Sequence, residues 1–201
     1  MKQFGILVFV LALFSFTVYE FKLTDEERTK AIDHLTQSRE KVLATVEGLS
    51  EEQLNFKPSE ESWSIAEIVE HIAISENAIP QSIDGALQET ADVSRRSEVS
   101  MTDDELVAMI TDRSQKFKTS EAFEPSGKFG SYEETLQNFL DKREENLNYI
   151  RTTEDDLRNH YSKFPFGTVD AYQVMLFMSG HTERHTMQME EVKADPGFPQ
   201  D

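Results

Sequence analysis

Apolar residues recur every three or four positions in four separate stretches of the chain. The first stretch begins at Thr24 and carries its apolar side chains at Ile32, Leu35, Val42, Val46 and Leu49. Three more stretches begin near residues 64, 131 and 168. This spacing is typical of amphipathic helices that cover a shared core with one face. We therefore expect an all-α fold with four long helices.

Capping boxes mark where three of these helices begin. In such a box, a serine or threonine and a glutamate three residues later satisfy each other's backbone amides. The pairs are Thr24 with Glu27, Ser64 with Glu67, and Ser131 with Glu134. The fourth helix is expected from about Thr168 to Ala194, where Asp195-Pro196-Gly197 stops it.

A long connection separates the second helix from the third. Pro80 must kink or end the second helix, because proline lacks a backbone N–H and clashes with the preceding turn. Residues 90–130 show only one short helical pattern, near residues 102–110, and residues 120–130 form a loop pattern. Four long helices with one long connection predict a four-helix bundle in a single domain.

Charge excludes several classes of partner. The chain has 20 basic and 38 acidic residues, which gives a formal net charge of −18. Such a surface repels phosphate backbones, so we expect no nucleic acid and no electrostatic binding to anionic lipid. The sequence has no cysteine, so a metal would need histidine, aspartate or glutamate ligands. A small-molecule substrate is the expected partner, and a homodimer remains open.

The N-terminal segment is typical of a secretory signal. Lys2 precedes an apolar run from Phe4 to Val18, and polar sequence follows. The run is shorter than the roughly 18 residues of a membrane-spanning helix. We therefore expect residues 1–18 to be a signal peptide, residues 19–201 to form the bundle, and the protein to be extracytoplasmic (periplasmic or secreted). The alternatives are a buried N-terminal helix or an uncleaved anchor, which would be the chain's one membrane contact.

The fourth helix carries the sharpest chemical pattern, His181-Thr182-Glu183-Arg184-His185. Residues four apart on a helix lie one above the other, so both imidazoles can reach one ion. The two histidines also lie on the apolar face that includes Val174 and Met178. The alternative is a pair of core histidines, each of which would need its own hydrogen-bond partner. The pairing favours metal ligands.

His71 is the candidate for a third ligand, because it shares a side of the second helix with Ile68 and Ile74. Spacing alone does not separate a ligand from a histidine at the edge of the core. Three neutral imidazoles would leave a position for water or substrate, as in catalytic metal sites. Glu67 lies one turn before His71 and is a candidate catalytic base or second-shell group. Its alternative role is only to complete the capping box.

These residues resemble the DinB superfamily. The resemblance is carried by residues 46–54, by residues 63–73 from Trp63 to Ala73, and by residues 167–189 with the His-x-x-x-His pattern. It implies a DinB-like four-helix bundle with an unusual long connection between helices two and three. It also implies a divalent metal ion, such as Zn, Ni, Fe or Mn, held by His71, His181 and His185.

The resemblance also implies an activity. Characterised members include thiol-dependent S-transferases and isomerases that use bacillithiol, mycothiol or glutathione, and many others are described only as metal-dependent hydrolases. The expected function is therefore a metal-dependent hydrolase or thiol transferase. Export argues against the transferase, because those thiols are mainly cytosolic. The alternatives are a non-catalytic metal- or ligand-binding bundle and a structural relic that binds no metal.

The remaining candidates have simpler interpretations. His34 lies with Ser38 on the polar side of the first helix, and His160 lies in a loop. Arg143 interrupts the apolar face of the third helix, where it could bind an anionic substrate or, more simply, a facing glutamate. Trp63 is expected to pack at one end of the bundle.

Export gives the first testable prediction. Protein recovered from its native host should lack about the first 17 to 19 residues, because the basic, apolar and polar segments are in the order that a signal peptidase requires. Intact-mass measurement decides this. A full-length product in the cytosol would contradict it.

Overall fold

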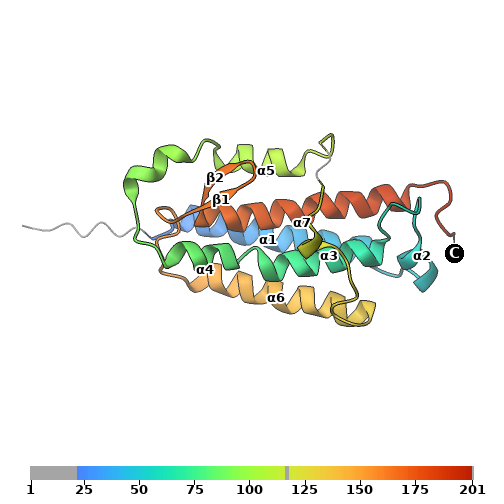
Figure 1. The fold of residues 1–201 in the computed structure, drawn as a ribbon. Coiled ribbons are helices and arrows are strands. Elements are labelled where there is room, and N and C mark those ends of the chain that lie inside the picture. Colours follow the sequence, from blue (N-terminus) through green and yellow to red (C-terminus); the bar gives the residue numbers. More distant parts are fainter. Residues whose placement is uncertain (1–21, 116–117, 201) are drawn as a thin grey trace, which may run out of the picture.

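The computed structural model describes residues 22–115 and 118–200, so the segment expected to be a signal peptide lies outside the described residues. Four long helices run side by side (Figure 1), which confirms the expected four-helix bundle. They are α1 (Asp25–Val46), α3 (Ile65–Ala78), α6 (Tyr132–Thr152) and α7 (Ala171–Lys193). Among the helices that the structure describes, none is long and apolar enough to cross a membrane.

The capping boxes begin the helices where the sequence places them. In each of α1, α3 and α6, the N-cap hydroxyl accepts the backbone amide of the glutamate three residues later, at 3.2 Å. Two shorter helices, α2 (Glu51–Asn55) and α5 (Asp103–Thr111), begin with boxes of the same kind. The segment expected to be a plain connector after the first helix therefore contains α2.

The directions of the helices explain the long connection. Around the bundle the order is α1, α7, α3, α6, with each helix packed against the next and α6 closing on α1. In Figure 1, α1 and α7 run one way, and α3 and α6 run the other way. Because α3 and α6 are parallel neighbours, the chain must return along the whole bundle between them.

The return path is made of short elements. Ala78 is the last residue of α3, and Pro80 is the N-cap of α4 (Gln81–Leu87), as the proline predicts. The chain then passes through the 3₁₀ turn η1 (Val93–Glu98), runs along the outer face of α7 as α5, and reaches the 3₁₀ turn η2 (Glu121–Phe123) before α6.

A β-hairpin precedes the last helix and was not expected from the sequence. Strands β1 (Tyr161–Phe164) and β2 (Gly167–Asp170) are antiparallel, with Thr168 opposite Lys163. The helix begins at Ala171, three residues later than expected. Its N-cap is Asp170, whose carboxylate accepts the amide of Gln173 at 2.7 Å. The apolar pattern of α7 runs on into β2, which is why spacing alone placed the start too early.

A fully buried ion pair lies at the centre of the bundle. The guanidinium of Arg143 donates to both carboxylate oxygens of Glu76, at 2.7 Å each, and the two side chains are 0% and 1% exposed. It also donates to the carbonyl of Leu35, to the hydroxyl of Ser38 and to the hydroxyl of Thr182. One side chain of α6 is thus bonded to α1, α3 and α7.

Two expectations are settled by this cluster. Of the two roles considered for Arg143, the ion pair with a facing glutamate is the one the structure shows. Ser38 was expected on the polar side of the first helix but is buried, because its hydroxyl accepts from Arg143 and also bonds to Ser179. The core of this bundle therefore contains a satisfied polar network as well as apolar side chains.

Breaking this pair should be costly. Glu76→Gln leaves the buried guanidinium without a counter-charge, and we expect it to lower the free energy of unfolding by about 3–5 kcal/mol. The double variant Glu76→Leu/Arg143→Met removes both charges and should recover much of that loss. Urea unfolding measures both.

The control is Glu144→Gln, which weakens two ion pairs of an exposed carboxylate, with Arg39 and with Arg151. It should cost less than about 1 kcal/mol. The account of the core is wrong if Glu76→Gln costs no more than this control.

Candidate metal centre

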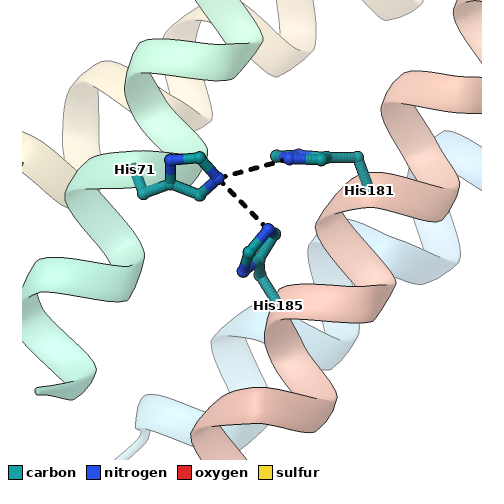
Figure 2. Close-up of side chains that lie close together, drawn as sticks. All are labelled: His71, His181 and His185. Carbon is teal, nitrogen blue, oxygen red and sulfur yellow. Dashed lines mark hydrogen bonds between the residues drawn. The ribbon is translucent and has the colours of Figure 1, made fainter. Parts of the chain in front are cut away.

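The three histidines singled out in the sequence meet between two helices. His71 projects from α3, and His181 and His185 project from successive turns of α7 (Figure 2). The Nε2 atom of His71 lies 3.2 Å from Nε2 of His181 and 3.1 Å from Nε2 of His185. The structure therefore brings His71, which the sequence could place only on another helix, against His181 and His185.

Hydrogen bonds on the far side of two rings fix where their protons are. Nδ1 of His71 donates to the backbone carbonyl of Phe123 at 2.7 Å, and Nδ1 of His185 donates to Oε1 of Gln188 at 2.8 Å. A carbonyl oxygen can only accept, so Nδ1 carries the proton in both neutral rings. Each Nε2 then presents a lone pair to the centre of the cluster, which is how metal-bound histidines are commonly oriented.

The spacing of these nitrogens fits a first-row divalent ion. With metal–nitrogen bonds of about 2.0–2.1 Å, two ligands are roughly 3.3 Å apart at a tetrahedral angle and about 2.9 Å apart at a right angle. The observed 3.1 and 3.2 Å separations lie between these values. Lone pairs this close repel one another unless a cation lies among them. Neutral imidazoles suit zinc, copper, iron or nickel.

Burial keeps the three rings neutral. It lowers the pKa of His71, against the effect of the hydrogen bond to Phe123. It lowers the pKa of His185 to about 3, helped by the nearby ring of His71. Burial of most of the His181 ring, and then the other two rings, lower the pKa of His181 well below its usual value, although one edge of the residue is exposed. The cluster is thus ready to bind a cation at neutral pH without first losing protons.

Aromatic rings flank the cluster on two sides. The Trp63 ring lies 4.9 Å from the ring of His71 and 6.5 Å from that of His185, measured between centroids. Phe177 lies 6.0 Å from His181 and packs on Phe164 of the hairpin. His71 and His185 are buried, whereas His181 is partly exposed, so solvent reaches the cluster at the His181 edge.

Trp63 lies just before the start of α3 and next to two of the three histidines. Trp63 precedes the N-cap Ser64 and is therefore not part of α3. Its side chain lies against His71, eight residues further on.

Glu67 is held in its capping box. Its Oε2 accepts the backbone amide of Ser64 at 2.8 Å, and its Oε1 is paired with Lys57 at 2.6 Å. The capping role considered for it is therefore the one that the structure shows. A role as catalytic base is not tested by these contacts and stays a prediction.

The two histidines expected outside the site do lie elsewhere. His160 is bonded to the carbonyls of Asp156 and Glu89, in the segment before β1. His34 is half-buried on α1 and is not among the three clustered residues. Both can serve as control positions.

A glycine lets the return path approach the cluster. A Cβ on Gly180 would lie 2.4 Å from Cγ2 of Ile110 on α5, which is too close for any side chain. Arg184 reinforces this approach by donating to the carbonyls of Ile110 and Asp112 at the end of α5. The residues that directly precede His181 and His185 therefore dock α5 on α7 beside the face that carries the two histidines.

The neutral histidines should make the metal-free protein sensitive to acid. Because their pKa values are lowered on folding, the unfolded chain takes up protons below about pH 6.5 that the folded chain does not. Their contribution to stability is complete above this pH and is lost as the pH falls below it. The slope is up to about 1.4 kcal/mol per pH unit for each ring. Urea unfolding with a chelator, at several pH values between 7 and 5, measures it.

The matched variant is His185→Asn, which removes one of the three rings. Its stability should fall less steeply with acid than that of the wild type. Equal slopes would show that the buried rings do not carry the effect.

Comparisons with known proteins agree with this fold. The sequence model of the DinB superfamily matches residues 34–189. YuaE of Bacillus subtilis (strain 168), itself uncharacterized, is 28% identical over 149 residues, covering 74% of this chain and 88% of YuaE. YfiT from Bacillus subtilis, described as a probable metal-dependent hydrolase with an unusual four-helix bundle topology, shares the fold. Its TM-score is 0.58 at 15% identity, over 88% of this chain and 91% of YfiT. The chain belongs to the DinB superfamily.

Proposed function

We propose that this chain holds one divalent transition-metal ion at His71, His181 and His185, and that it is a metal-dependent hydrolase. The observation that carries the proposal is the convergence of Nε2 atoms, with the protons of His71 and His185 held on Nδ1. The likeness to YfiT in fold is consistent with it.

A divalent ion held by three neutral imidazoles keeps its full charge and acts as a Lewis acid that lowers the pKa of water toward 7. The chain's own residues supply the geometry. Phe123 and Gln188 hold two ligand rings in one orientation. Trp63 and Phe177 cover two sides, so a small-molecule substrate would approach at the partly exposed edge of His181.

Thiol transfer is the related alternative. Glutathione and bacillithiol carry carboxylates that basic side chains would bind, and two arginines near the histidines are already engaged. Arg184 donates to the carbonyls of α5, and Arg113 pairs with Glu191. Together with the proposed export, this favours water over a thiol as the nucleophile.

One observation supports a candidate of another class, a non-catalytic metal- or ligand-binding bundle. Among the described residues, the hydrogen-bond partners of the three rings are each other, the Phe123 carbonyl and Gln188, and they include no carboxylate. A hydrolase needs a proton acceptor near its nucleophile. Glu67 could fill this role only by leaving its cap and Lys57.

Metal binding is tested by titrating the chelator-treated protein with Co²⁺ or Zn²⁺. We expect one ion per chain. His181→Ala and His185→Ala should abolish stoichiometric binding, and His71→Ala should weaken it strongly. Trp63 is the single tryptophan, and its ring lies against His71. Its fluorescence should therefore be quenched by the open-shell Co²⁺ and much less by Zn²⁺.

The controls are His34→Ala and His160→Ala, which should bind like the wild type. If His34→Ala loses the ion while His185→Ala keeps it, the site is wrongly assigned. Enzyme and binding bundle are then separated by turnover of a panel of aryl esters and amides. Activity that disappears on chelation and in His185→Ala supports the hydrolase, and equal background rates support the binding bundle.

A further inference from the structure

Next to His71, Glu70 makes an unusual set of contacts. Its side chain is buried, 8% exposed, on α3. Its two carboxylate oxygens accept three successive backbone amides, those of Ser126 and Gly127 at 3.0 Å and that of Lys128 at 2.7 Å. The charge of a buried carboxylate is here balanced by backbone N–H groups from the loop that joins η2 to α6.

The loop is shaped to present these amides. Gly127 has a φ of +74°, in the left-handed region that side chains other than glycine rarely adopt. A left-handed residue within a turn can aim successive N–H groups into one concavity, which binds an anion. In this protein the anion is a side chain of its own, Glu70.

The same loop also reaches the metal centre. Phe123 lies three residues before Ser126, and its carbonyl accepts the Nδ1 proton of His71. Neighbouring residues of α3 therefore hold both ends of residues 123–128, Glu70 at one end and His71 at the other. The contact to His71 is to a backbone atom, so it depends on where the loop lies and not on the Phe123 side chain.

The ligands differ in how they are oriented. His185 is oriented by Gln188, one turn further along the same helix, and this contact needs no loop. His71 is oriented by a carbonyl from a distant segment, 52 residues away in the sequence. Whatever fixes that segment also fixes the proton of His71 on Nδ1 and the direction of its Nε2.

We propose that Glu70 is a positioning residue for the metal centre. By binding the amides of residues 126–128, it holds the Phe123 carbonyl against His71 and so raises the affinity of the three histidines for a divalent ion. This rests on the proposed metal site. Metal binding and the order of this loop are then coupled in both directions, because each stabilises the same orientation of His71.

The test compares Glu70→Gln with the wild type. Glutamine is nearly the same size as glutamate, but one of its two terminal groups is an NH₂ donor. That group cannot accept a hydrogen bond from the backbone amides of residues 126–128, so at least one of these bonds is lost. We expect faster hydrogen exchange at the amides of residues 126–128 and an altered ¹⁵N signal of the His71 ring. We also expect Zn²⁺ affinity to be weaker by about 10- to 100-fold, as for other groups that orient metal ligands.

A second variant reaches the same loop without touching the carboxylate. Gly127→Ala introduces strain at a positive φ, although its Cβ would meet nothing within 4 Å. It should shift exchange and Zn²⁺ affinity in the same direction. The matched controls are Glu105→Gln, which alters a carboxylate in the capping box of α5, and Gly85→Ala, at a helical glycine with open space. Both should bind Zn²⁺ like the wild type.

Affinities are measured well below the thermal midpoint of each metal-free variant, so a merely structural role would lower the midpoint and leave the affinity unchanged. Equal Zn²⁺ affinity in Glu70→Gln and wild type overturns the inference, as does an unchanged exchange rate in the loop. A wild type that binds no ion contradicts the proposed function instead. In that case the inference is judged on the His71 ring signal of the metal-free protein, which must still change in Glu70→Gln.

Discussion

The guanidinium of Arg143 is the point where all four long helices are joined. It is bonded to Glu76 of α3, to Ser38 and the Leu35 carbonyl of α1, and to Thr182 of α7. Directional bonds at one buried point fix the helices against sliding, which apolar packing alone does weakly. Glu76 lies just over one turn from His71, and Thr182 is the neighbour of His181. The contact that sets the register of α3 and α7 therefore also sets His71 opposite the other two histidines.

The topology accounts for the rest of the site. Because α3 and α6 are parallel, the chain between them must travel back along the bundle, and it does so across α7 and past the histidines. On that path α5 packs against Gly180 and accepts hydrogen bonds from Arg184. The loop before α6 donates backbone amides to Glu70. A connection that the helix directions make necessary thus supplies the carbonyl that orients His71. The fold and the site are parts of one arrangement.

Much of this could be predicted from the sequence, because the information was local. A capping box and an apolar face lie within a single helix, so the starts of three helices were predicted correctly. The fourth was predicted at Thr168, three residues before its actual start at Ala171. His181 and His185 are four residues apart, and their shared face follows from helical geometry. His71 needed the family resemblance as well, since nothing in its own helix says which neighbour it faces.

What was missed depends on contacts between distant segments. The carbonyl of Phe123 is a backbone atom, which every residue has, so no residue type marks it as a partner of His71. Trp63 reaches the site from outside α3. Ser38 is polar and was assigned to the surface, because the guanidinium that satisfies it comes from another helix. Phe123 and Trp63 lie outside the helical patterns of the sequence, and they become part of the site only because the folded chain brings their segments next to His71.

The central claim is that three imidazoles bind one ion, and the most direct measurement is X-ray absorption spectroscopy of the protein loaded with one equivalent of Zn²⁺. Three histidine nitrogens are expected at about 2.0–2.1 Å from the metal, with the remaining positions filled by exchangeable oxygen ligands such as water. A first shell with fewer than two imidazoles, or one composed only of oxygen ligands, would contradict it.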